Sequence, residues 1–165
     1  TRVCLRFPLV SGEAHRSIDD SSMGDTDQQT VLLADCRILL IEDEPGVRTL
    51  LAGALRRHGA VVEERGDGVG IVGVAESFRP DVVITDMVMP LSSGPQVLAD
   101  LRARWPELPM LVVSGHEPER GEGIELDHKT RFLAKPFMGK TLVRNVAYLL
   151  QARDEAAAAQ QRALA

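Results

Sequence analysis

The sequence lacks three features that mark broad functional classes. Its formal net charge is -5, from 24 acidic and 19 basic residues, so it has none of the basic excess that general nucleic-acid binding requires. No apolar run approaches the roughly 20 residues that cross a bilayer, and the first ten residues lack the long apolar centre of a signal peptide. These absences predict a cytoplasmic protein that binds no nucleic acid and makes no membrane contact through this segment.

Cysteine is also scarce, with only Cys4 and Cys36 in 165 residues. A chain of this length can bury a hydrophobic core without the help of a disulfide. Neither cysteine has histidine or cysteine neighbours at the spacing of metal ligands. We therefore expect two free thiols and no zinc site.

The chain divides into four segments of different composition. Residues 1–10, TRVCLRFPLV, alternate apolar and polar side chains as a β-strand does. Residues 11–36 are mostly polar, with the Ser, Asp and Gly that are typical of a flexible linker. Residues 37–150 contain the apolar segments of a folded domain, and residues 151–165, rich in Ala and Gln, are expected to form a helix extension or a frayed tail.

Short apolar segments alternate with segments of helical periodicity through the folded domain. The predicted strands are 37–41, 60–64, 80–86, 108–115 and 131–137, and the predicted helices are 45–57, 69–78, 95–105 and 140–165, with a weaker helical pattern at 116–129. This alternation predicts an α/β fold, a doubly wound sheet of five parallel strands with helices on both faces. In such folds ligands bind beyond the carboxyl ends of the strands.

Polar side chains mark the carboxyl ends of four of the five predicted strands. They are Glu42 and Asp43 at the first strand, Asp86 at the third, Ser114 at the fourth and Lys135 at the fifth. Because the carboxyl ends of parallel strands meet at one edge of the sheet, we expect these side chains to converge. Three carboxylates held together repel one another and need a cation. Hard oxygen ligands without His or Cys favour magnesium over zinc.

These residue types suit phosphoryl chemistry. A carboxylate beside a metal ion can act as a nucleophile toward a phosphoryl group, and a lysine and a hydroxyl can stabilise the charge on the phosphoryl oxygens. Each residue also has an ordinary explanation, since Ser114 before a glycine suits a turn and Lys135 suits an exposed surface. Glu44 before Pro45 suits a helix start, and we assign it that role. The placement of the other residues at successive strand ends favours a common site.

Four of the segments resemble the receiver domain of two-component response regulators. They are LLIEDE, VVITDMVMP, LVVSG and FLAKPF, and their order and spacing along the chain are also those of the family. The resemblance covers residues 37–150. It implies the flavodoxin-like strand order 2-1-3-4-5 and a phosphoacceptor at Asp86. Asp43 and Asp86 would ligate magnesium directly, and Glu42 would act mainly through water. The main-chain carbonyl of Val88 would be a further ligand.

The same resemblance implies roles for three more residues. Lys135 and Ser114 would hold the phosphoryl group, and Ser114 moving toward it would draw the switch residue Phe132 inward. The Lys135–Pro136 peptide bond would be cis. The readout surface would combine residues 116–129, the fifth strand and the last helix.

The resemblance also implies partners. The phosphoryl donor would be a histidine kinase or a histidine phosphotransfer domain, and a second copy of the chain is a candidate partner in a homodimer. The receiver would catalyse its own phosphorylation and dephosphorylation.

Residues 1–9, TRVCLRFPL, carry a second resemblance. They look like the last strand of a histidine-kinase ATP-binding domain, which ends in a similar hydrophobic-x-Phe-Pro pattern. A polar linker and a receiver that follow such a strand imply the C-terminal receiver of a hybrid sensor histidine kinase. In that case the parent protein is a histidine kinase.

Two other functions are weighed against the receiver. A phosphate-independent interaction module of the same fold would bind no metal, and it would keep the mutually repelling acids without using them. A magnesium-dependent phosphatase of the haloacid-dehalogenase type would use Asp86 as its nucleophile. Such enzymes carry a second acid two residues later, and this chain has Val88 there.

Overall fold

A five-stranded sheet organises the part of the chain that the structure describes, residues 33–115 and 127–163 of a computed structural model. The strands are β1 (Arg37–Ile41), β2 (Val61–Arg65), β3 (Val82–Asp86), β4 (Met110–Ser114) and β5 (Thr130–Ala134). They lie in the order β2-β1-β3-β4-β5, and every neighbouring pair is parallel. The predicted doubly wound α/β fold and its strand order are confirmed.

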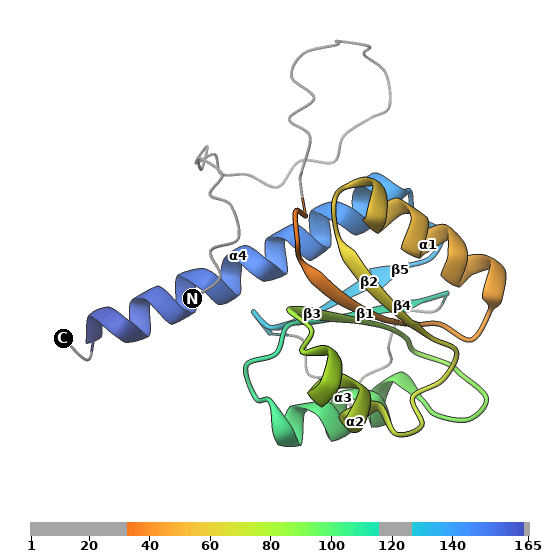
Figure 1. The fold of residues 1–165 in the computed structure, drawn as a ribbon, viewed down its shortest axis with the longest axis horizontal. Helices are drawn as coiled ribbons and strands as arrows, with labels where there is room; N and C mark the ends of the chain where they lie inside the picture. The colour runs from red at the N-terminus through yellow and green to blue at the C-terminus, as the bar shows by residue number, and fades with distance from the viewer. Residues whose placement is uncertain (1–32, 116–126, 164–165) are drawn as a thin grey trace, which may run out of the picture.

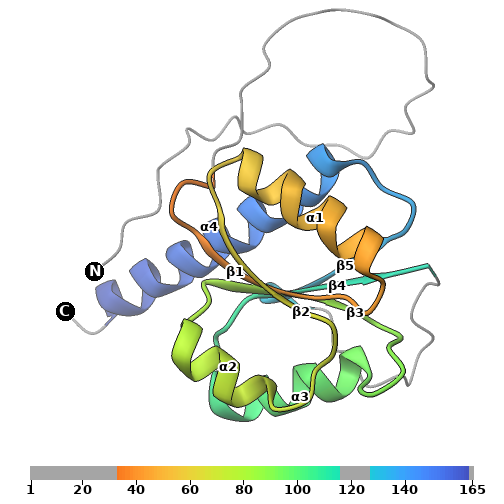
Figure 2. The ribbon, with the colours of Figure 1, turned by 45° about the vertical axis from the view of Figure 1, so that its right-hand side comes forward.

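Helices cover both faces of this sheet (Figure 1). Within the described residues they are α1 (Pro45–Arg57), α2 (Ile71–Phe78), α3 (Gly94–Arg104) and α4 (Gly139–Ala163). Figures 1 and 2 show α1 and α4 on one face and α2 and α3 on the other. Parallel strands need crossover connections, and right-handed crossovers to both sides of β1 place helices on both faces.

The central strands supply two separate hydrophobic cores. Ile38 and Leu40 of β1 pack with α1 and α4, whereas Leu39 and Ile41 pack with α2 and α3. All four side chains are fully buried. Successive strand residues point to opposite faces, and both faces are covered, so the segment must be apolar throughout. This explains the uninterrupted apolar run that leads into the acidic residues.

The core includes residues that lie before the predicted domain boundary at residue 37. Leu33 and Cys36 are buried in the core formed with α1 and α4, and the Leu33 amide donates to the His58 carbonyl at 2.7 Å. Asp35 turns the chain between them with a positive φ of 59°. Four residues assigned to the linker therefore belong to the folded domain, because an irregular turn carries no periodicity by which a sequence pattern could reveal it.

Four of the five strands differ by one to three residues from their predicted bounds, whereas the last helix continues as one of the two predicted alternatives. β5 ends at Ala134 rather than at Phe137, since Pro136 has no amide hydrogen with which to continue the ladder. Helix α4 runs without a break to Ala163, so residues 151–163 are helical.

Three predictions lie wholly or mainly outside the described residues. They concern the strand at 1–10, most of the linker at 11–36 and most of the weak helical pattern at 116–129. They stay predictions. Among the described helices, none combines the length and the hydropathy that crossing a membrane would require.

Candidate functional site

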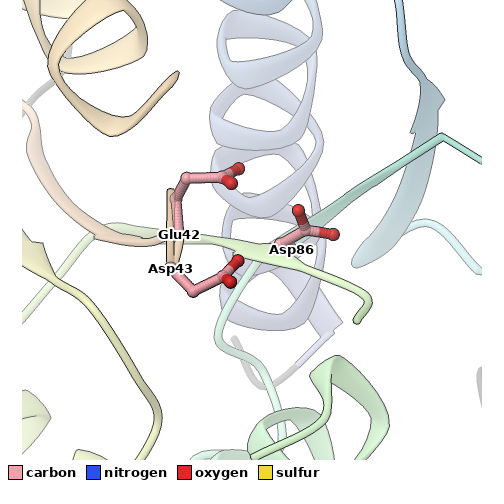
Figure 3. Close-up of side chains that lie close together, drawn as sticks. All are labelled: Glu42, Asp43 and Asp86. Carbon is pink, nitrogen blue, oxygen red and sulfur yellow. The ribbon is translucent and has the colours of Figure 1, made fainter. Parts of the chain in front are cut away.

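Three carboxylates meet at the carboxyl edge of the sheet (Figure 3). The ladder pairs Ile41 of β1 with Thr85 of β3, so the residues that follow, Glu42 and Asp86, emerge side by side. Asp43 comes next in the chain, and one oxygen of each of the three carboxylates lies within 4.8 Å of the others. The strand register therefore accounts for the convergence that the sequence predicts.

The ammonium of Lys135 lies between two of these carboxylates. Its Nζ donates to Asp86 Oδ2 at 2.6 Å and to Glu42 Oε2 at 2.8 Å. The Lys135 amide donates to the Ser114 carbonyl at 2.6 Å, and the Lys135–Pro136 bond is cis as predicted. Lys135 thus reaches from the end of β5 to acids at the ends of β3 and β1.

Burial and charge oppose each other at Glu42. Its side chain is 1% exposed. This burial and the negative charge of Asp86 raise the pKa of Glu42. The hydrogen bond and the charge of the Lys135 ammonium work to lower the pKa, but they do not outweigh the burial. For Lys135, burial works to lower the pKa, but the hydrogen bonds to Asp86 and Glu42 outweigh it and raise the pKa. The fold therefore favours a charged Lys135 and penalises the charge on Glu42.

We expect Glu42→Gln to increase the free energy of unfolding at neutral pH in the absence of magnesium, because the neutral amide avoids the burial of a charge. The pKa of Glu42 in the folded state lies above its ordinary value of 4.5. At a pH between 4.5 and the raised pKa, the folded state binds more protons than the unfolded state. The free energy of unfolding therefore falls as the pH rises through this range. The neutral amide introduced by Glu42→Gln removes this pH dependence of the free energy of unfolding. Urea unfolding in EDTA over a range of pH measures it.

The matched control for this prediction is Glu44→Gln, which makes the same change at the exposed neighbouring N-cap of α1. It should leave the pH dependence as it is in the native chain. A loss of stability in Glu42→Gln at neutral pH would show instead that the ion pair with Lys135 outweighs the burial of the carboxylate.

The other predicted residues lie at the same edge of the sheet. Ser114 is buried at the end of β4, one residue beyond the ladder partner of Asp86. The Val88 amide donates to Asp86 Oδ1 at 3.2 Å, and the Val88 side chain is 71% exposed. Phe132 of β5 is partly buried and packs against the core formed with α2 and α3. Their roles stay predictions.

The donor set is suited to a hard divalent cation. Three carboxylates offer oxygen ligands, and the single ammonium of Lys135 donates to two of them. Magnesium is bound in proteins through a few carboxylates, with waters and substrate phosphates completing its octahedron. The residues present therefore fit a magnesium ion.

Sequence patterns missed two residues that shape this site. A Cβ on Gly94 would lie 2.6 Å from the Asp86 carbonyl oxygen, so only glycine lets the start of α3 pass so close to the end of β3. Arg48 donates hydrogen bonds to the carbonyls of Glu42 and Asp43. One feature of the sequence could have singled out Arg48. It places a positive charge in the first turn of a predicted helix, where the helix macrodipole disfavours it.

Comparisons with known proteins agree with this geometry. The sequence model of the response regulator receiver domain matches residues 38–147. The sensor kinase CckA of Brucella abortus is 34% identical over 131 residues, which are 78% of this chain and 14% of CckA. The response regulator MprA of Mycobacterium bovis is 34% identical over 125 residues, which are 74% of this chain and 54% of MprA. The crystal structure of the receiver domain from the hybrid histidine kinase CckA is 35% identical with a TM-score of 0.58, and the match covers 69% of this chain and 98% of that one.

The matched region includes every predicted site residue and all five strands except the first residue of β1. The chain spans a small part of the sensor kinase and about half of MprA, so the similarity concerns one domain of each. Receiver domains use magnesium in their phosphorylation and partner with histidine kinases or phosphotransfer proteins. The chain belongs to the response regulator receiver domain family, the phosphoacceptor modules of two-component signal transduction.

Proposed function

We propose that Asp86 accepts a phosphoryl group from a phosphohistidine on a histidine kinase or a histidine phosphotransfer domain. The observation that carries this proposal is the contact of Lys135 Nζ with Asp86 Oδ2 at 2.6 Å inside a cluster of three carboxylates. A carboxylate oxygen of Asp86 attacks phosphorus, and the P–N bond of the donor breaks with its electron pair leaving on the imidazole nitrogen. The product is an acyl phosphate on Asp86.

The acidic cluster would hold the magnesium ion. Asp43 and Asp86 would bind it directly, Glu42 would act mainly through water, and the Val88 carbonyl would be a further ligand. When bound, magnesium neutralises charge on the phosphoryl oxygens. The proximity of the three carboxylates, which repel one another unless a cation lies among them, supports this assignment.

Lys135 and Ser114 would hold the phosphoryl group once it is formed. Lys135 already lies at hydrogen-bond distance from the acceptor carboxylate, so its ammonium can reach a phosphoryl oxygen on Asp86 by side-chain rotation. Ser114 is buried on the neighbouring strand, and its hydroxyl would bind another oxygen. Phe132 would respond by moving inward, which shifts the surface around β5 between two states.

Incubation of the chain with magnesium and acetyl phosphate tests the proposal. Intact mass spectrometry should show one added phosphoryl group, and EDTA should prevent the addition. Hydroxylamine should remove the label, because it cleaves acyl phosphates, and peptide mapping should assign it to Asp86. A chain that neither binds magnesium nor takes up the label would contradict the proposal and favour the phosphate-independent module.

We also propose that this receiver is the C-terminal part of a cytoplasmic hybrid sensor histidine kinase. The pattern in residues 1–9 supports it, as does the similarity to a receiver within the sensor kinase CckA. Residues 1–10 would then end the ATP-binding domain, and the segment from residue 11 would connect it to the receiver. An antibody against this chain should detect a native polypeptide much larger than 18.0 kDa. A native protein of about that mass would contradict the proposal.

A further inference from the structure

Arg48 holds the backbone of the loop that carries the acidic pair. Its Nη1 donates to the Glu42 carbonyl at 2.5 Å and to the Asp43 carbonyl at 3.2 Å. Its main-chain amide donates to the Glu44 carbonyl at 2.9 Å. One residue thus binds three successive carbonyls, and two of them belong to residues whose side chains form the carboxylate cluster.

The guanidinium of Arg48 lies against the Gly-Asp-Gly turn after β2. A Cβ on Gly66 would lie 3.4 Å from Arg48 Nη1 and 3.9 Å from Cζ, so the guanidinium packs directly on the glycine. The Glu42 amide donates to the Arg65 carbonyl at 3.1 Å, which ties the end of β1 to the residue before this turn. Arg48 is therefore half-buried between two loops.

Helix capping alone does not account for Arg48. A cation in the first turn of a helix is disfavoured by the positive end of the macrodipole. Glu44 at the N-cap makes no side-chain capping hydrogen bond, although Ser, Thr, Asp or Asn would supply one there. Arg48 therefore places a positive charge where the helix macrodipole disfavours it. Its guanidinium donates to the main-chain carbonyls of Glu42 and Asp43.

We propose that Arg48 is a positioning residue of the metal site, which fixes the backbone of Glu42 and Asp43 so that their carboxylates face Asp86. The inference rests on the proposed function. Without the cation, the three carboxylates repel one another, and a loop with free carbonyls would relax by moving Asp43 away. Holding the carbonyls keeps the ligand set assembled before the ion arrives. Groups that orient metal ligands in this way change metal affinity by about 10–100-fold when they are removed.

Arg48→Met tests this role because it keeps the aliphatic stem and removes the donors. In the full chain we expect the Kd for magnesium, measured by calorimetry, to rise about tenfold. The magnesium concentration for half-maximal labelling by acetyl phosphate should rise equally, while the labelling rate at saturating magnesium stays near that of the native chain. Arg48→Lys should recover part of the affinity, because an ammonium can still donate to one of the carbonyls.

Arg57→Met is the matched control, because it removes the same charge from the exposed last turn of α1. Its magnesium dependence should equal that of the native chain. A purely electrostatic role of Arg48 predicts the opposite sign, since removing a cation near carboxylates tightens magnesium binding. Unchanged or tighter binding in Arg48→Met, with or without a loss of stability toward urea, would overturn the inference while the proposed function stands. A native chain that neither binds magnesium nor is labelled would overturn both.

Discussion

Asp86→Asn is expected to abolish phosphoryl labelling and to leave the fold intact. The amide has no ionised oxygen that can attack phosphorus. Lys135 keeps its partner Glu42 at 2.8 Å, and the substitution removes one of three carboxylates that repel one another. We therefore expect no loss in the free energy of unfolding without magnesium. Intact mass after incubation with magnesium and acetyl phosphate, together with urea unfolding, measures both results.

The control for this substitution is Asp100→Asn, which makes the same chemical change at an exposed residue of α3. Its labelling should match that of the native chain. Labelling that survives in Asp86→Asn would mean that another residue accepts the phosphoryl group, and the assignment of the acceptor would be wrong.

The second large effect is expected from Lys135→Met, which removes the ammonium between Glu42 and Asp86. Removing one partner of a fully buried ion pair costs about 3–5 kcal/mol. The Lys135 side chain is 24% exposed, so solvent screens part of the interaction, and we expect a loss of about 2 kcal/mol at neutral pH without magnesium. Magnesium should restore part of this stability, because a cation again lies among the carboxylates. Urea unfolding with and without magnesium measures the two values.

The loss in Lys135→Met should shrink as the pH falls. Lys135 works to lower the pKa of Glu42, so in the variant that pKa rises further and the folded state takes up a proton at higher pH. The neutral carboxyl no longer repels Asp86, and the stability relative to the native chain recovers on the acid side. Lys129→Met is the control, since its ammonium pairs at 2.9 Å with Glu107, whose side chain is 69% exposed. Equal losses in the two variants would contradict the importance of the buried pair.

The architecture could be predicted from the sequence because its signals are local. The apolar residues 38–41 predict a strand covered on both faces, and the acids that follow them are expected to leave the core. Asp86 and Lys135 lie at the ends of similar runs, so the edge of the sheet where they meet could be predicted from the sequence. The cis Lys135–Pro136 bond followed from the family resemblance and is present.

The geometry of the site was decided only by contacts between distant segments. The pairing of Ile41 with Thr85 brings Glu42 beside Asp86, and no sequence pattern specifies that register. Lys135, just after β5, reaches Asp86 across one intervening strand and Glu42 across two. Hydrophobic periodicity predicts which side chains are buried, but it does not predict which distant groups a long side chain contacts.

Arg48 and Leu33 are two residues whose contacts the sequence pattern does not reveal. The helical pattern at residues 45–57 gives no role to Arg48, yet its guanidinium donates to the carbonyls of Glu42 and Asp43. Leu33 read as part of a linker, yet a turn buries it in the core. The sequence by itself determined the order of strands and helices and the chemistry at the strand ends. Register, side-chain reach and the irregular turn depend on the assembled sheet, because each is stabilised by groups that lie far apart in the chain.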